Sequence, residues 1–172
     1  MNDADSRIYH FDGSAWTLFH EVPAKKLYHI WGLDANNIYV SGSDTILYYD
    51  GSWREISPPG TRIYEGVWGV AANDLLAFGS GFYGTYDGSG WTIYNLSNSY
   101  INGVWGSSTG YPIFGAGHFG YPPDITNNLF KYNEGWEVVT GTPSNTHALY
   151  AIWGASSEFF AVGNMGTVLH YQ

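Results

Sequence analysis

The tripeptide Ile30-Trp31-Gly32 returns three times along the chain, as Val67-Trp68-Gly69, Val104-Trp105-Gly106 and Ile152-Trp153-Gly154. Successive tryptophans are 37, 37 and 48 residues apart. A spacing in this range is typical of repeat architectures, in which each repeat is one supersecondary unit that buries its apolar surface against its neighbours. The repeat, and no single residue, therefore decides the fold.

Each unit continues in the same order. A polar turn, an apolar run that ends in glycine, a second apolar and aromatic run, an Asp-Gly turn and another tryptophan follow the Trp-Gly pair. The runs are short, rich in β-branched and aromatic residues, and bounded by Gly, Asn, Asp and Ser, which is the signature of strands. Apolar residues do not recur at helical spacing over any long window. The chain is therefore predicted to be all-β.

Four short strands joined by tight turns form one twisted antiparallel sheet with two apolar faces. Stacking such sheets radially covers both faces, which is the β-propeller arrangement. The prediction is one domain, 1–172, with about four four-stranded blades in units at 7–25, 26–61, 62–99, 100–144 and 145–172. We label the strands of each unit a, b, c and d in chain order.

The first unit is partial because it has only strands c and d, and the last is partial because it has only a, b and c. Pairing of the strand at Ala15–His20 with the strand at Thr167–Tyr171, within one chain or between two, closes the ring with strands from both termini. One c strand is then surplus. It lies outside the ring, or the chain is a piece of a larger protein, or two chains complete each other through these unpaired terminal strands.

The order of the motifs Ile-Trp-Gly, Val-x-Gly, Gly-Thr-Val/Ile-Leu-x-Tyr and Asp-Gly-x-x-Trp resembles that in the repeats of bacterial exported β-propellers. It is distantly similar to Asp-box (BNR) propellers, whose motif is shortened here to Asp12-Gly13-Ser14-Ala15-Trp16 and Asp50-Gly51-Ser52-Trp53. The resemblance spans about Arg7 to Tyr171. It implies a binding scaffold in a secreted, periplasmic or cell-surface protein, and the shortened Asp-box does not extend it to sialidase-like activity.

Composition excludes several kinds of partner. Six Lys and Arg against fifteen Asp and Glu give a net charge of −9, which argues against nucleic acid and anionic membranes. No apolar run is long enough for membrane insertion, and the polar start of the chain does not resemble a signal peptide. With no cysteine, disulfides and thiolate chemistry are excluded.

Most conspicuous residues are expected to be structural. The tryptophans of the Trp-Gly pairs should pack between blades, with stacking on sugars as the alternative. The Asp-Gly turns are ordinary hairpin devices. No catalytic residue, cofactor or metal is expected; a metal site assembled from His29 and His147 is the alternative.

Function is better sought where the repeats differ. The third b–c connection, residues 116–128, is about ten residues longer than its counterparts, and long connections are often functional. In a propeller the b–c and d–a connections emerge on the same face. The predicted ligand-binding residues on that face are His118, Phe119 and Tyr121, with Phe82, Tyr83 and Asp44 nearby.

These features predict a non-enzymatic binding or interaction propeller that recognises a carbohydrate or a protein. Exposed aromatic rings beside Asn, Asp and His suit either ligand. One alternative is a glycoside-acting propeller enzyme fragment. The other is a purely structural repeat segment of a larger exported protein.

Overall fold

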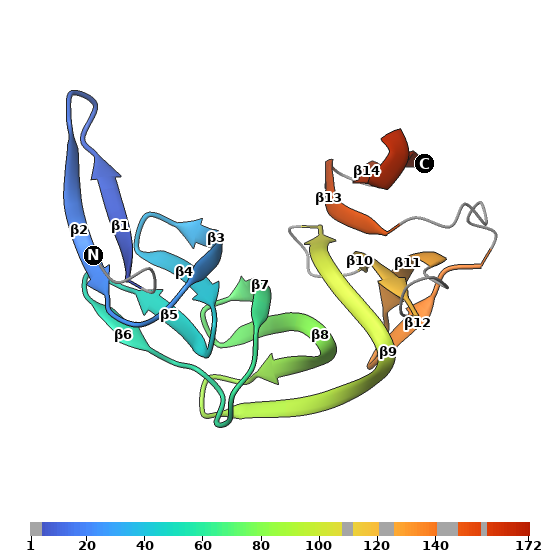
Figure 1. Ribbon diagram of the computed structural model, residues 1–172, viewed down its shortest axis with the longest axis horizontal. Coiled ribbons are helices and arrows are strands. Elements are labelled where there is room, and N and C mark those ends of the chain that lie inside the picture. Colours follow the sequence, from blue (N-terminus) through green and yellow to red (C-terminus); the bar gives the residue numbers. More distant parts are fainter. Residues whose placement is uncertain (1–4, 108–111, 121–125, 141–147, 156–157) are drawn as a thin grey trace.

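The computed structural model describes residues 5–107, 112–120, 126–140, 148–155 and 158–172, and it is built almost wholly of strands. The one helix among these residues is a single 3₁₀ turn, η1 (Asn164–Gly166). The strands form successive antiparallel sheets along an open arc (Figure 1). The prediction of an all-β fold with radially arrayed sheets is confirmed.

The chain begins with a two-stranded N-terminal hairpin, β1 (Ser6–Phe11) and β2 (Trp16–Val22). Blade 1 follows as a complete four-stranded sheet in chain order: β3 (Leu27–Asp34), β4 (Asn37–Gly42), β5 (Thr45–Tyr49) and β6 (Trp53–Glu55). These strands are the a, b, c and d elements expected from the repeat.

Blades 2 and 3 share a long strand. Blade 2 contains β7 (Tyr64–Ala71), β8 (Asp74–Tyr86) and the first half of β9 (Trp91–Gly106). Blade 3 contains the second half of β9, then β10 (Ile113–Phe119), β11 (Thr126–Tyr132) and β12 (Trp136–Val138). Blade 4 has three strands, β13 (Leu149–Ala155), β14 (Glu158–Gly163) and β15 (Val168–Tyr171).

Two strands differ from the expected division of the chain. Strand β8 includes both the b and the c segments of blade 2, and Figure 1 shows this strand folding back on itself. Gly81 lies between the two segments, and its φ of +76° suits glycine. Strand β9 runs through the boundary predicted between residues 99 and 100. It continues across this boundary because its first half pairs with β8 and its second half with β10.

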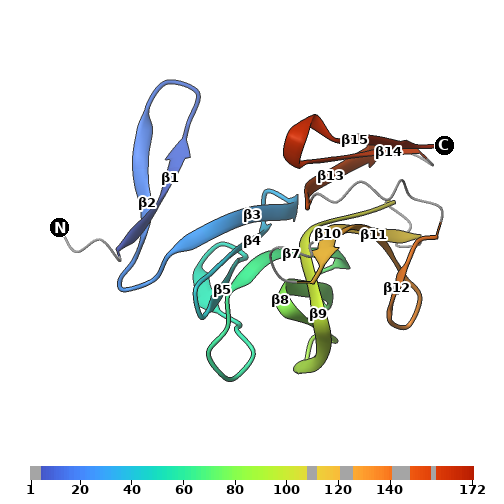
Figure 2. The same cartoon turned by 45° about the vertical axis from the view of Figure 1, so that its right-hand side comes forward.

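The described residues do not show ring closure. Strand β2 pairs with β1 and β15 pairs with β14, and β2 and β15 belong to different sheets. Figures 1 and 2 show the N-terminal hairpin and blade 4 at the two ends of the arc. Closure by pairing of the terminal strands stays a prediction.

The tryptophans of the Trp-Gly pairs pack toward the following blade. Trp31 lies 6.4 Å from Trp68 between ring centroids, and Trp105 lies 5.8 Å from Phe159. Trp68 joins the cluster shared by blades 2 and 3, with Leu76 and Ile113. The expected inter-blade packing is confirmed for these three and is wrong for Trp153, which is 70% exposed in the described part of the chain.

A second set of tryptophans, at the start of the d strands, packs toward the preceding blade. The indole N–H of Trp91 donates to the carbonyl of Ile56 in blade 1. The ring of Trp136 contacts Tyr83 of blade 2 edge-on. Trp53 stacks on His20 of the N-terminal hairpin. Its counterpart in that hairpin, Trp16, has no preceding blade and is 70% exposed.

Candidate ligand-binding face

The four a strands share one irregularity. In each blade the register between strands a and b skips one residue of strand a, which forms a β-bulge. The skipped residues, here called the bulge residues, occupy the same place in all four blades: Tyr28, Glu65, Asn102 and Tyr150. Bulges redirect a side chain and are common next to functional sites.

A glycine in strand b lies beside every bulge. A Cβ atom on Gly42 would overlap the carbonyl oxygen of Lys26, and one on Gly117 would overlap that of Tyr100. The same holds for Gly79 and Gly163, which face other backbone carbonyls. Only glycine allows this close approach of the backbone, which explains why every apolar b strand contains this glycine.

The bulge brings its side chain to the residue that follows this glycine. The hydroxyl of Tyr28 lies 2.9 Å from Ser43 Oγ, and Asn102 Nδ2 lies 3.4 Å from His118 Nδ1. In blades 2 and 4 the residues at the corresponding positions are Ser80 and Asn164. The backbone is therefore repeated, while the chemistry of these paired positions differs from blade to blade.

Hydrogen bonds join the b–c turns to the d–a connections. The N–H of Ser43 donates to the carbonyl of Lys26 at 2.8 Å, and the N–H of Asn164 donates to that of Ala148 at 3.0 Å. In blade 3 the N–H of Gly120 donates to the carbonyl of Asn98 at 2.8 Å. The prediction that these connections share one face is confirmed. We call it the bulge face.

A groove of about 380 Å³ opens on this face between blades 1 and 2, which is within the size range of ligand pockets. Its lining residues are Ser43, Asp44, Thr61, Arg62, Ile63, Ser80 and Phe82. The guanidinium of Arg62 lies over the Phe82 ring, 5.6 Å from its centroid. Ser80 also pairs with Tyr100 of β9.

Asp44 is the one predicted site residue that lines this groove with an accessible polar side chain. Its φ of +52° forms the b–c turn, and aspartate tolerates this left-handed conformation. The carboxylate accepts a hydrogen bond from the N–H of Arg62 at 2.6 Å. Asp44 therefore both builds the turn and presents charge to the groove.

Phe82 and Tyr83 are largely core residues, although Phe82 also lines the groove, and their role as ligand contacts stays a prediction. Each is only 5% exposed. Phe82 packs edge-on against Tyr64, and Tyr83 stacks on Tyr94 with centroids 4.7 Å apart. Their position near a turn suggested exposure, but stacking of adjacent blades buries both rings.

His118 and Phe119 lie on β10 and not in a loop, because the insertion lengthens the b–c hairpin. Phe119 pairs with Ser99 and Thr126. His118 stacks on Tyr100, with centroids 4.4 Å apart and planes 5° apart. Phe119 is exposed beside them. Tyr121 lies outside the described residues.

Burial shifts the pKa values of the titratable groups near this face. It raises the pKa of Glu65 and lowers the pKa of His118 and His29. Because burial disfavours the charged form, His118 is held neutral and can accept a hydrogen bond from Asn102. A shifted carboxylate of this kind is often a functional group.

The alternative metal site is not testable in this structure because His147 lies outside the described residues. Within the described ranges, no group of three or more His, Asp or Glu side chains could hold a metal ion. Nor does any helix in the described part of the chain have the length and apolar character needed to cross a membrane.

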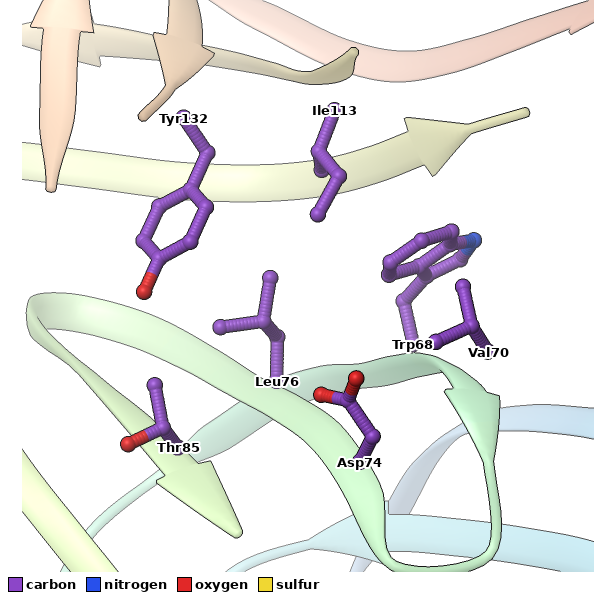
Figure 3. A pocket seen from close by; sticks show the side chains of 7 residues that line it. All are labelled: Trp68, Val70, Asp74, Leu76, Thr85, Ile113 and Tyr132. Atoms are coloured by element: carbon purple, nitrogen blue, oxygen red, sulfur yellow. The ribbon is translucent and has the colours of Figure 1, made fainter. Parts of the chain in front are cut away.

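A second, smaller cavity lies between blades 2 and 3, and we interpret it as a packing gap. Figure 3 shows Trp68 and Leu76 of blade 2 pointing toward Ile113 and Tyr132 of blade 3, with Asp74 at the side. Its volume is about 50 Å³, which is well below that of ligand pockets.

Sequence reasoning missed the bulge residues and Arg62. The bulge residues share no side-chain type, so an alignment of the units does not single them out. Two signals together could have identified them. One is the glycine beside each bulge, and the other is the change of residue type at the position three residues before each Trp-Gly tryptophan. Arg62 could have been noticed as one of only six cationic residues in the chain.

Comparisons with known proteins place the fold. No protein-family model matches the chain, and no curated protein matches it. Solved structures do. One is Ycf48 bound to D1 peptide, with TM-score 0.63 and 13% identity over 93% of this chain and 55% of that one.

Another is the extracellular domain of a hybrid two-component system from B. thetaiotaomicron. Its TM-score is 0.68 and its identity 14%, over 99% of this chain and 26% of that one. Both are β-propeller proteins. This chain therefore has a β-propeller fold, and it spans about half of one similar chain and a quarter of the other.

Proposed function

We propose that this chain is a non-enzymatic interaction module that binds a segment of a partner protein across the bulge face. The observation that carries this proposal is the repeated β-bulge. The backbone is the same in four blades, but it presents Tyr28, Glu65, Asn102 and Tyr150. Features that are identical in all repeats are those that the blade fold requires. The bulge side chains differ between blades, and this variation supports a role in binding a ligand.

The chemistry of the face suits a peptide with a basic side chain. Burial raises the pKa of Glu65, so a cation beside its carboxylate would recover the lost solvation. Asp44, which lines the groove, adds another carboxylate to the bulge face. The net charge of −9 favours the approach of a basic partner.

Similar folds support a binding role in general terms. Ycf48 was solved with a D1 peptide, and the other structure is an extracellular domain. From the second likeness we propose, in line with the repeat resemblance, that this chain acts in an exported protein. Detection of the protein in periplasmic or culture fractions would test that location.

A carbohydrate ligand is the second candidate. The stacked pair of Tyr100 and His118 stands beside the exposed ring of Phe119. Aromatic rings of this kind offer faces for sugar stacking. On a glycan array, binding that is lost with Phe119→Ala would favour carbohydrate over peptide.

The test is a peptide array read with the labelled chain, followed by calorimetry on the best basic peptide. We expect Glu65→Gln to weaken binding at least tenfold, equivalent to about 1.4 kcal/mol. The matched control is Glu137→Gln, at an exposed position on β12, which should leave the Kd unchanged. Equal affinity of both variants and wild type contradicts the proposed site. Hydrolysis of generic glycosides by the chain contradicts a non-enzymatic role.

A further inference from the structure

We infer that the two ends of the arc are complementary, and that blade 4 of one copy docks against blade 1 of a second copy. The contact would place Trp153 on the strand that carries Gly32. Four observations lead to this arrangement, and none depends on the proposed ligand.

The first observation is that two Trp-Gly tryptophans pack at the same place on the next blade, which we call the seat of the ring. The ring of Trp68 lies where a Cβ atom on Gly106 would stand, and the ring of Trp105 lies where one on Gly154 would stand. In each case the tryptophan of one blade covers the Trp-Gly glycine of the next. Trp153 repeats this motif but is 70% exposed. Its expected seat is therefore another Trp-Gly strand.

The second observation identifies an unoccupied seat of this kind. Ile30, next to Trp31 in β3, is 63% exposed, whereas Val67 at the same position in blade 2 is 1% exposed. Gly32 is also exposed, and the three atoms nearest to its Cβ position belong to Asp34, Asn37 and Ile38 of its own sheet. Blade 1 thus lacks, on its β3 side, the neighbour that covers the later blades.

The third observation is a groove of about 290 Å³ between the N-terminal hairpin and β3. It is lined by Ile8 and Tyr9 of β1, by Leu27–Ile30 of β3, and by Arg7 and Val40. The hairpin supplies only the c and d strands of a blade, and it packs on blade 1 through Val22. The groove lies where the a and b strands of that blade would run. Strands β13 and β14 of a second copy are strands of this type.

The fourth observation is the other exposed tryptophan. The d-strand tryptophans pack toward the preceding blade, as Trp91 does on Ile56. Trp16 occupies this position in the N-terminal hairpin and is 70% exposed. In the proposed arrangement blade 3 of the first copy becomes its preceding blade. One contact therefore covers both exposed tryptophans.

The described residues form an open arc (Figure 1), whose two ends carry the exposed surfaces named above. The contact is heterologous, since different surfaces of the two copies meet. Two such contacts around a twofold axis make a closed ring and leave no sheet face open.

Analytical ultracentrifugation of the 172-residue chain at micromolar concentrations tests the inference. We expect a species of twice 19.1 kDa. On dilution it should dissociate, with a red shift in tryptophan emission as Trp153 and Trp16 enter water. A mass that stays at 19.1 kDa up to high micromolar concentration overturns the inference.

Paired variants identify the surfaces. Trp153→Arg and Ile30→Glu should each weaken self-association at least tenfold, with the β-sheet circular dichroism spectrum unchanged. The control is Tyr94→Ser, at an exposed aromatic in the middle of the arc, which should still associate. Mixing the two charged variants should restore a dimer, because the mixture retains one native contact and pairs Arg with Glu in the other. Failure to restore it, or association through Trp153 alone without Ile30, overturns the head-to-tail contact.

Discussion

The indole ring of Trp68 occupies the space that a Cβ atom on Gly106 would need, since that atom would lie 2.5 Å from Trp68 Cζ2. Real Cβ atoms do not approach other atoms so closely. Gly154 meets the ring of Trp105 in the same way, so in blades 3 and 4 the glycine of the Trp-Gly pair packs against the tryptophan of the preceding blade. This relationship explains why the pair recurs as a unit.

Gly106→Ala should therefore destabilise the chain. Forcing a methyl group into a packed interface typically costs about 1–3 kcal/mol of unfolding free energy. The control is Gly90→Ala, because nothing lies within 4 Å of the Cβ position there, and its effect should stay within about 0.5 kcal/mol. Urea denaturation followed by circular dichroism measures both. Equal effects would contradict the Trp68–Gly106 interface.

Removing the two kinds of Trp-Gly tryptophan should have very different effects. Trp68 is 8% exposed in the cluster between blades 2 and 3, so Trp68→Ala should cost roughly 3–5 kcal/mol. Trp153→Ala should change the stability of the dilute monomer by less than about 0.5 kcal/mol, because its ring is exposed. Thermal melts at low protein concentration compare them. A tolerated Trp68→Ala would mean that this ring is not part of the core.

Asn102→Ala should loosen blade 4. The side-chain amide of Asn102 donates to the carbonyl of Leu149 at 2.7 Å, and Leu149 is fully buried. Leaving that acceptor without its donor should cost about 1–3 kcal/mol. The matched bulge variant is Tyr28→Phe, whose lost partner is the hydroxyl of Ser43 at an exposed site. It should cost about 0.5 kcal/mol or less. Hydrogen exchange in β13 should rise in Asn102→Ala alone.

Glu65 should make stability depend on pH in a direction opposite to that of an ion-paired carboxylate. Burial raises its pKa above the ordinary value of 4.5. Between the ordinary and the raised pKa the folded chain binds more protons than the unfolded chain, so stability falls as pH rises through this window. Glu65→Gln removes that loss. The stability of the variant relative to wild type should therefore increase from pH 4 to pH 7. A constant difference over this range would show that Glu65 is solvated.

The blades were predictable because their signals are local. Alternating apolar residues, Asp-Gly turns and Trp-Gly pairs specify strands and hairpins within each unit. The run of β9 through residues 95–99 was not predictable, because Asn95, Ser97 and Asn98 favour turns. Pairing of Asn95 with Phe82 and of Ser99 with Phe119 keeps that segment within one strand, although Asn98 itself has a φ of +55°.

The bulge face was predictable only in part. Its two kinds of connection were identified from propeller topology, and Asp44 lines a groove there, while its role as a ligand contact stays a prediction. The burial of Phe82 and Tyr83 was not predictable, because burial by an adjacent blade is not visible in a local pattern. The bulge residues escaped notice because a bulge is a property of strand pairing and requires no particular side chain.

The sequence by itself determined the all-β class, the repeat and the residues at each inter-blade seat, since period and turn chemistry act over a few residues at a time. Tertiary structure decided which rings are covered. Trp68 and Trp153 stand in the same local motif, but within the described residues Trp68 is covered by blade 3 while Trp153 is 70% exposed. Burial depends on contacts between units far apart in the chain, and for this reason the unpaired ends of the arc became visible only in three dimensions.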